Sequence, residues 1–206
     1  NQLQVLSEQL LALAGRRLPA DVPLWEDIRA DLPRNLSPEA PARGHWWVRD
    51  AAQIDGITLH HTMTNNLEAT AQYCTRPRAQ GGKGYPTTQY AFWVAADGQV
   101  FYCVDVTEGM WHDHCGDKNT HISIGMAGRL DIAPPPDAQL QATARLVAHL
   151  MRTYGILVER VAGHNDWALR CAGIQTICPG WDVAGWRNAF YAALENLVKT
   201  EVDDEG

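Results

Sequence analysis

Two fragments that lie far apart in the chain carry the side chains that most constrain its fold. The first reads Leu-His-His-Thr and contains His60, and the second begins with Gly-His-Asn-Asp, which contains His164, and leads on to Cys178. Imidazole nitrogens and thiolate sulfurs are zinc ligands, and a catalytic zinc site has three protein ligands and one open position. A site built from these three residues requires a fold that brings distant parts of the chain to one point.

Length and charge limit the class of protein. The chain has 206 residues and a formal net charge of -7, and 46% of its residues are hydrophobic. This length allows one substantial core, and the composition is ordinary for a globular protein. Nucleic-acid-binding proteins normally carry a basic patch or stripe, so the acidic balance argues against a nucleic-acid partner.

The sequence contains no candidate membrane span or signal peptide. No apolar run reaches the roughly 18 residues that a membrane-spanning helix needs. Residues 3–14 are rich in apolar side chains, but Glu8 interrupts them and no basic segment precedes them, so we predict no signal peptide. The chain begins at Asn1 rather than at Met, so removal of a leader peptide stays an alternative.

Residues 1–45 differ from the rest of the chain. Leucines recur at helical spacing over residues 2–16, which predicts an amphipathic helix, and prolines punctuate the stretch that follows. This segment is either a packing extension or the remnant of a binding or targeting module. We therefore divide the chain into a helical, proline-rich extension at 1–45, a main domain at 46–200 and an acidic tail at 201–206.

The main domain mixes predicted strands and helices. β-Prone residues on both sides of an Asp-Gly turn predict a hairpin, and apolar residues at helical spacing predict helices. The mixture indicates an α/β fold with a central mixed β-sheet flanked by helices. The predicted strands cover residues 57–59, 89–95, 99–104, 121–126 and 159–162, and the predicted helices cover residues 65–73, 137–154 and 182–198.

The cysteines and histidines, taken alone, allow two interpretations. The cysteine count of five is odd, so at least one is unpaired, and the other four allow zero, one or two disulfides. In one interpretation, His60, His164 and Cys178 bind zinc. In the other, the histidines are buried and hydrogen-bonded, and the cysteine is a small core residue. A second metal site at His114 and Cys115 is not favoured.

An ordered set of short motifs favours the zinc-binding interpretation over the structural one. It includes Leu-His-His-Thr, an aromatic strand before Asp-Gly, a Trp-His pair, Ser-Ile-Gly, Gly-His and Cys-Pro-Gly. In this order the chain resembles the zinc-dependent N-acetylmuramoyl-L-alanine amidases, the family that includes phage lysozyme-type amidases and peptidoglycan recognition proteins. The matching pieces are residues 57–62, 89–94, 97–98, 110–112, 119, 123–125, 163–164 and 178–180.

The resemblance implies roles for particular residues. It implies that His60, His164 and Cys178 bind one zinc ion per chain. Tyr90 matches a tyrosine near the metal, and Thr176 stands where relatives carry a catalytic Lys or Thr. We therefore expect Tyr90 and Thr176 to be the catalytic residues of this chain.

Four further residues are candidates for contact with the substrate. They are His61, Trp111, His112 and Asn119. Adjacent residues of a strand point to opposite faces, so His61 is not expected to share a metal with His60. Trp111 is the best candidate for stacking on a sugar ring, although large aromatic side chains more often pack in cores or groove walls.

Two positions depart from the family pattern. Some members place a glutamate general base directly after the Ser-Ile-Gly strand, where this chain has Ala127. The chain therefore resembles the branch of the family that contains the tyrosine instead. Asn119 and Ser123 are also one residue further apart than the pattern suggests, which makes the alignment there ambiguous.

The resemblance implies an enzyme that cuts the amide bond between N-acetylmuramic acid and L-alanine in peptidoglycan. The alternative is a module that binds muropeptides without cutting them. Relatives of that kind tend to lose the metal cysteine, whereas Cys178 is present here. A third alternative is a metal-free interaction domain. We expect a monomer made in the cytoplasm and released onto the cell wall, as phage enzymes are, or secreted if a leader has been removed.

Overall fold

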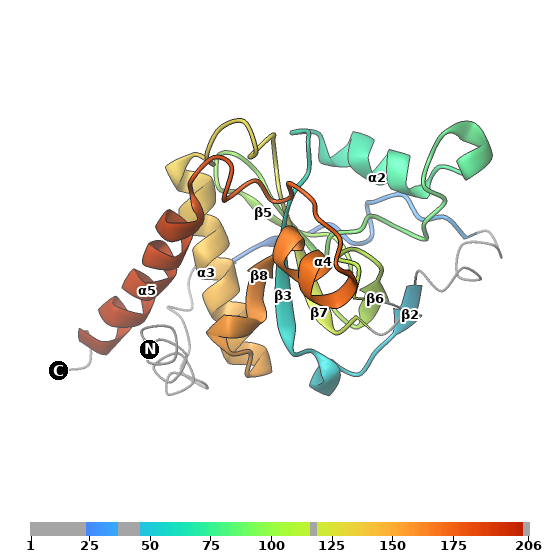
Figure 1. The fold of residues 1–206 in the computed structure, drawn as a ribbon. Coiled ribbons are helices and arrows are strands. Elements are labelled where there is room, and N and C mark those ends of the chain that lie inside the picture. The colour runs from blue at the N-terminus through green and yellow to red at the C-terminus, as the bar shows by residue number, and fades with distance from the viewer. Residues whose placement is uncertain (1–23, 37–45, 116–118, 204–206) are drawn as a thin grey trace.

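The computed structural model describes residues 24–36, 46–115 and 119–203. In these ranges, strands and helices alternate along the chain (Figure 1). The strands are β1 (Glu26–Asp27), β2 (Trp46–Val48), β3 (Gly56–His61), β4 (Phe92–Val94), β5 (Val100–Tyr102), β6 (Glu108–Met110), β7 (His121–Met126) and β8 (Val161–Gly163). The helices are α2 (Leu67–Thr75), α3 (Asp137–Tyr154), α4 (His164–Ala172) and α5 (Arg187–Asp203), with short 3-10 turns between some elements.

The main sheet is mixed, as predicted. Its six strands lie in the order β1-β5-β4-β7-β3-β8. Strands β4, β7, β3 and β8 run parallel to one another, whereas β5 runs antiparallel to β4. A second, two-stranded sheet pairs β2 with β6. Helices α3 and α5 lie together on one side of the sheet, and α2 and α4 lie toward the other side (Figure 1).

The period of two along β3 and β7 divides the sheet into an apolar face and a polar face. On β3, Ile57 and Leu59 join the hydrophobic core, whereas Thr58 and His60 alternate with them. On β7, Ile122, Ile124 and Met126 are in the core, and His121, Ser123 and Gly125 alternate with them. Successive side chains of a strand point to opposite faces. The core therefore lies on one side of these strands and the candidate site on the other.

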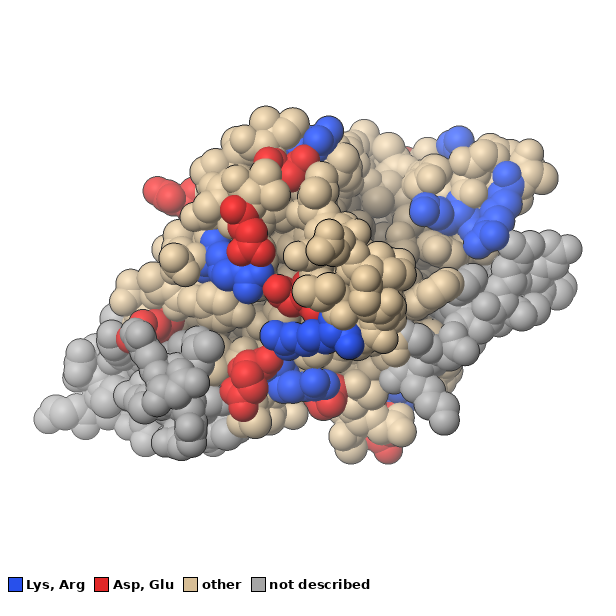
Figure 2. Space-filling model, in the orientation of Figure 1, with Lys and Arg blue, Asp and Glu red and all other residues tan. Residues whose placement is uncertain are grey.

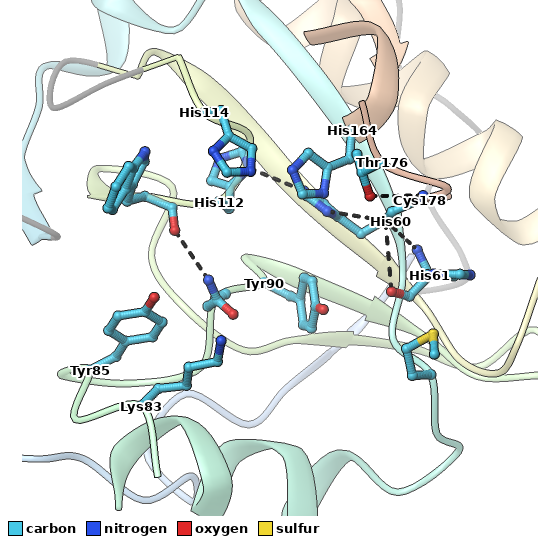
Figure 3. Close-up of a pocket in the computed structure, with 13 residues that line it drawn as sticks. His60, His61, Lys83, Tyr85, Tyr90, His112, His114, His164, Thr176 and Cys178 are labelled. Atoms are coloured by element: carbon cyan, nitrogen blue, oxygen red, sulfur yellow. Dashed lines mark hydrogen bonds between the residues drawn. The ribbon is translucent and has the colours of Figure 1, made fainter. Parts of the chain in front are cut away.

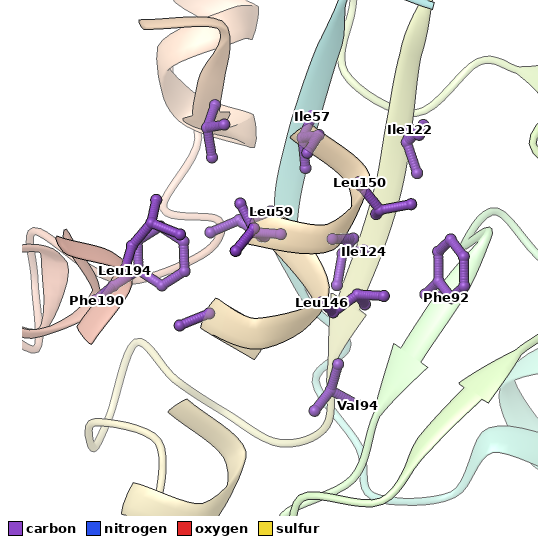
Figure 4. Close-up of a cluster of buried hydrophobic side chains, with 14 of the residues drawn as sticks. Ile57, Leu59, Phe92, Val94, Ile122, Ile124, Leu146, Leu150, Phe190 and Leu194 are labelled. Carbon is purple, nitrogen blue, oxygen red and sulfur yellow. The ribbon is translucent and has the colours of Figure 1, made fainter. Parts of the chain in front are cut away.

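Helices α3 and α5 cover the apolar face. Leu146 and Leu150 of α3 and Phe190 and Leu194 of α5 pack with the sheet residues (Figure 4). All four side chains are buried. Burial of such a side chain contributes about 1.5–3 kcal/mol each, so this layer supplies much of the stability that holds β3 in place.

The structure confirms several sequence-based elements and shifts others. The strand at 121–126 and the helix at 137–154 are found with the predicted bounds, and the hairpin forms between β4 and β5. The last helix begins at Arg187, five residues later than predicted, after Gly185 in a left-handed conformation. Helix α4 begins at His164, where the sequence analysis predicted no helix.

The N-terminal segment contributes to the sheet. Strand β1, which falls within the proposed extension, pairs in parallel with β5 at the sheet edge. The helix predicted at 2–16 lies outside the described residues. Helix α5 continues to Asp203, into the proposed acidic tail. Within the ranges described, no helix combines the length and apolar character needed to cross a bilayer.

Candidate metal centre and substrate cavity

Parallel pairing brings the two histidines of the distant fragments together. Strand β3 pairs in parallel with β8, and Leu59 stands opposite Gly163. His60 therefore lies near the carboxyl end of β3, and His164 follows β8 directly as the first residue of α4. Their ring centroids are 4.8 Å apart. Crevices at the carboxyl ends of parallel strands are common ligand sites in α/β proteins.

The loop that carries Cys178 packs against the end of β8. A Cβ on Gly163 would lie 2.6 Å from the ring of Pro179, so glycine is required for this close approach. The Asn165 N–H donates to the Cys178 carbonyl at 2.7 Å, and Asn165 Oδ1 accepts from the Thr176 N–H at 3.0 Å. Asn165 thus joins the start of α4 to the loop that contains the cysteine.

The three proposed ligands converge. One ligand atom each of His60, His164 and Cys178 lies within 4.8 Å of the others. Cys178 Sγ is 3.7 Å from His60 Nδ1, and it accepts from the His61 N–H at 3.4 Å. The buried His164 Nε2 atom has no hydrogen-bond partner among the described residues. Two imidazoles and one thiol are a zinc ligand set, and a buried ring nitrogen without a partner is consistent with a metal ligand.

Burial keeps the two histidines neutral. Loss of solvent lowers the pKa of His60 well below its ordinary value, and it lowers the pKa of His164 to about 4. Burial also raises the pKa of the Cys178 thiol to about 12. Neutral imidazole is the form that binds a metal, whereas the thiol must lose a proton. At neutral pH the site is therefore one deprotonation away from a complete ligand set.

A cavity of about 350 Å³ opens onto these residues. Figure 3 shows Tyr90 facing the histidines, with Lys83 and Tyr85 on the same side of the cavity. The rings of Tyr90 and His60 are 5.6 Å apart. Burial raises the pKa of Tyr90 well above its usual value, so its phenol remains a hydrogen-bond donor.

Strand β7 makes room for Tyr90. A Cβ on Gly125 would lie 2.7 Å from the Tyr90 ring, so only glycine leaves space for this side chain. Ser123 Oγ donates to the Gln89 carbonyl at 2.8 Å and accepts from the Ala91 N–H at 3.0 Å. The Ser-Ile-Gly motif thus fixes the segment that carries the tyrosine. Ala127 is buried at the end of this strand, and it supplies no carboxylate there.

Most of the predicted site residues meet at this cavity. The lining includes the following of them: His60, His61, Tyr90, Trp111, His112, His164, Thr176 and Cys178. The His61 ring lies 3.3 Å from Asp131, on the far side from His60, as strand alternation predicts. Asn119 is different, because its side chain is 2% exposed and does not line the cavity. The structure places Asn119 beneath the site, where it contacts Asp113 and His112.

Sequence reasoning missed several residues of the cavity wall. The His114 ring stacks on His164 at 5.3 Å between centroids, and its backbone has a positive φ of 64°. Nothing in the local pattern of the loop after α2 marked Lys83 or Tyr85. The missed lining residues are Met63, Lys83, Tyr85, Gln89 and His114.

One disulfide fastens the loop that follows β6. Cys115 is bonded to Cys171 of α4, whereas Cys74, Cys103 and Cys178 are free thiols. Asp113, Cys115 and His121 also lie close enough together to hold a metal ion. However, the Cys115 sulfur is engaged in the disulfide, and Asp113 already contacts Thr58 and His121 at 2.7 Å each. These groups form a structural network beside the candidate site.

Comparison with known proteins identifies the family. The family model for N-acetylmuramoyl-L-alanine amidases matches residues 50–181. The chain therefore belongs to the N-acetylmuramoyl-L-alanine amidase family. A search of curated proteins finds no match.

Solved structures share the fold. The Ph2119 endolysin from the Thermus scotoductus bacteriophage Ph2119 is 20% identical, with a TM-score of 0.57 over 72% of this chain and 89% of that chain. The LysCS endolysin from Clostridium intestinale is 18% identical, with a TM-score of 0.55 over 81% and 90%. The Drosophila peptidoglycan recognition protein SD is 10% identical, with a TM-score of 0.58 over 78% and 92%. The predicted fold and family resemblance are thus confirmed.

Proposed function

We propose that this protein is a zinc-dependent amidase that hydrolyses the bond between N-acetylmuramic acid and L-alanine in peptidoglycan. The observation that supports this most is the convergence of His60, His164 and Cys178 at the floor of a cavity. Membership of the amidase family supports the same reaction class. A bound zinc ion would supply an activated water and polarise the amide carbonyl.

The protein's own residues orient the amide. The protonated phenol of Tyr90 faces the three ligands and can donate a hydrogen bond to the oxygen on which negative charge develops. The Thr176 hydroxyl oxygen accepts a hydrogen bond from the Cys178 N–H at 3.2 Å, so the hydroxyl proton of Thr176 points away from that N–H. The Thr176 hydroxyl can therefore donate to the same substrate oxygen as Tyr90. Ala127 supplies no general base, so Tyr90 and Thr176 are the proposed catalytic residues.

The cavity wall suits an amphipathic, carboxylate-bearing ligand. Trp111 is 37% exposed at the wall and offers a flat surface to a sugar or peptide. Lys83 lies in the wall, and its ammonium is 5.9 Å from the centroid of the Tyr73 ring and pairs with no carboxylate of the described residues. Figure 2 shows basic side chains gathered over the end of α2, whereas acidic and basic groups lie side by side over α4 and α5. A substrate carboxylate would therefore find its counter-charge near Lys83.

A non-catalytic muropeptide-binding module is the second candidate, because the peptidoglycan recognition protein SD shares the fold. The presence of Cys178 beside the two histidines favours the enzyme. A metal-free interaction domain is less favoured, because His164 Nε2 is buried without a partner among the described residues. The similarity to endolysin structures supports synthesis in the cytoplasm and action on the cell wall.

Purified cell walls provide the test. We expect the turbidity of a wall suspension to fall and new N-terminal alanine to appear, without new reducing sugar ends. A chelator should stop the reaction and added zinc should restore it. Binding to walls without release of alanine would instead identify a recognition module. Full activity in chelator would exclude the zinc mechanism.

A further inference from the structure

We propose that His112 is a positioning residue for the zinc ligand His60, and not the substrate contact that the sequence suggested. This inference rests on the proposed function in one respect, the binding of zinc by His60. It is drawn from the bonds of two adjacent rings. His60 Nε2 lies 3.1 Å from His112 Nδ1, in a buried part of the site.

The two nitrogens of His60 have different neighbours. His60 Nδ1 faces the Cys178 sulfur at 3.7 Å, so Nδ1 is the nitrogen directed at the metal position. A nitrogen that binds a metal uses its lone pair, so the ring proton of His60 must be on Nε2. That proton then points at His112 Nδ1, which must act as an acceptor.

This requirement fixes the tautomer of His112. If Nδ1 accepts, the His112 proton is on Nε2, which lies 3.4 Å from the His121 carbonyl. The Asn119 amide nitrogen lies 3.2 Å from His112 Nε2, and it donates one of its two hydrogens to the Asp113 carboxylate. With the proton on His112 Nε2, two N–H groups face each other there, so the contact with Asn119 is not a hydrogen bond in this tautomer. A chain of hydrogen bonds thus runs from His60 through His112 to a backbone carbonyl.

A buried network holds the end of this chain. The Arg49 guanidinium donates to the Asn119 and His121 carbonyls at 2.9 Å each. Asp113 is fully buried and accepts hydrogen bonds from Thr58 and His121. Because both nitrogens of His112 are engaged within the protein and its side chain is 3% exposed, His112 presents little polar surface to the substrate.

Two substitutions separate positioning from substrate contact. In His112→Asn, Oδ1 lies near the place of Nδ1 and can still accept from His60, whereas His112→Leu fills the space without an acceptor. We expect His112→Leu to weaken zinc binding about 10- to 100-fold in competition with a chromophoric chelator. His112→Asn should stay within a few-fold of the native protein. His149→Asn, on α3 and away from the cavity, is the control.

The alternative role predicts another pattern. A substrate contact would raise KM in both His112 variants and leave the zinc dissociation constant unchanged, and that result would overturn the proposal. Equal loss of zinc affinity in the two variants would also overturn it, because the acceptor would then not matter. Thermal unfolding of the metal-free proteins shows whether either variant is misfolded.

The native protein offers a test that needs no variant. Long-range ¹H–¹⁵N spectra of the zinc-loaded protein report which nitrogen of each histidine carries the proton. We expect protons on Nε2 of both His60 and His112. A proton on His112 Nδ1 would overturn the proposal. Zinc binding with these tautomers but without wall hydrolysis would instead contradict only the proposed enzymatic function.

Discussion

The sulfur of Cys178 lies 3.7 Å from Nδ1 of His60, although 118 positions separate the two residues in the chain. Two features produce this approach. Parallel pairing of β3 with β8 places the start of α4 beside His60, and Asn165 then ties the Cys178 loop back to that helix. The sulfur also accepts a hydrogen bond from the His61 backbone N–H. Its position is therefore held both by β3 and by the loop that Asn165 anchors.

Replacement of this sulfur should remove the metal. We expect Cys178→Ser to lose most of the bound zinc, because a serine hydroxyl is a poor zinc ligand and its oxygen reaches less far than sulfur. Zinc per chain is measured by elemental analysis after gel filtration. Cys103→Ser is the control, since Cys103 is also a free buried thiol but lies in a separate apolar cluster. A zinc content near one per chain in Cys178→Ser would show that the third ligand is wrong.

Removal of the Tyr90 hydroxyl should slow turnover without loss of metal. The phenol is the donor that faces the reacting position, so Tyr90→Phe should lower kcat by about 10- to 1,000-fold. Zinc content should be unchanged, because the Tyr90 ring approaches His60 only at 5.6 Å between centroids. The assay is release of N-terminal alanine from walls. Tyr73→Phe, at an exposed position of α2, serves as control. A native rate for Tyr90→Phe would show that the Tyr90 hydroxyl takes no part in catalysis and that the residue is structural.

The sequence was most informative where local pattern and fold agree. The apolar stripe from Leu140 to Tyr154 predicted α3, and the alternation in β7 predicted that strand. The short strands β2 and β6 were missed because strands of three residues depend on their partner rather than on their own pattern. Helix α4 was not predicted, because it is only nine residues long and only Trp167 and Ala168 of it are buried, so it has no long apolar stripe. In the structure, the Asp166 carboxylate accepts from the Gly163 N–H and caps that helix.

The candidate site could be predicted only in part, because some of its contacts depend on tertiary structure rather than on local sequence. The ligand set follows from residue types and a family resemblance, and the structure brings those residues together. His112 was a candidate for substrate contact because it belongs to the Trp-His pair of the family resemblance, but its contact with His60 depends on how β6 and β3 are arranged. Lys83 reaches the cavity from a loop with no distinctive motif. Contacts of this kind are created by tertiary structure, and short-range patterns do not encode them.

Asn165 provides a matched pair of substitutions. Its Oδ1 accepts from the Thr176 N–H, so Asn165→Asp keeps the acceptor and Asn165→Ala removes it. We expect Asn165→Ala to weaken zinc binding by about 10-fold, because partners that orient a ligand are typically worth that much. Asn165→Asp should bind nearly as the native protein does. Metal competition with a chelator measures both. Identical affinities for the two variants would show that this bond does not position the Cys178 loop.

Zinc binding should release about one proton from the Cys178 thiol at neutral pH. Burial raises the pKa of this thiol to about 12, so the metal-free protein holds the proton that the thiolate must lose. The histidines add no release in this range. Burial lowers the pKa of His164 to about 4 and that of His60 well below its ordinary value, so both rings are already neutral. Lower pH therefore weakens binding through the thiol.

The slope of affinity against pH tests this assignment. With one thiol proton released, zinc affinity should rise about tenfold for each unit of pH between roughly pH 5.5 and 7. Histidines with ordinary pKa values near 6.5 would add their own protons below that value, and the slope would then steepen toward three as the pH falls. Calorimetry in buffers of different ionisation enthalpy counts the protons directly. A steepening slope would show that the rings are more solvated than their burial indicates, whereas a slope of zero would exclude the thiol as a ligand.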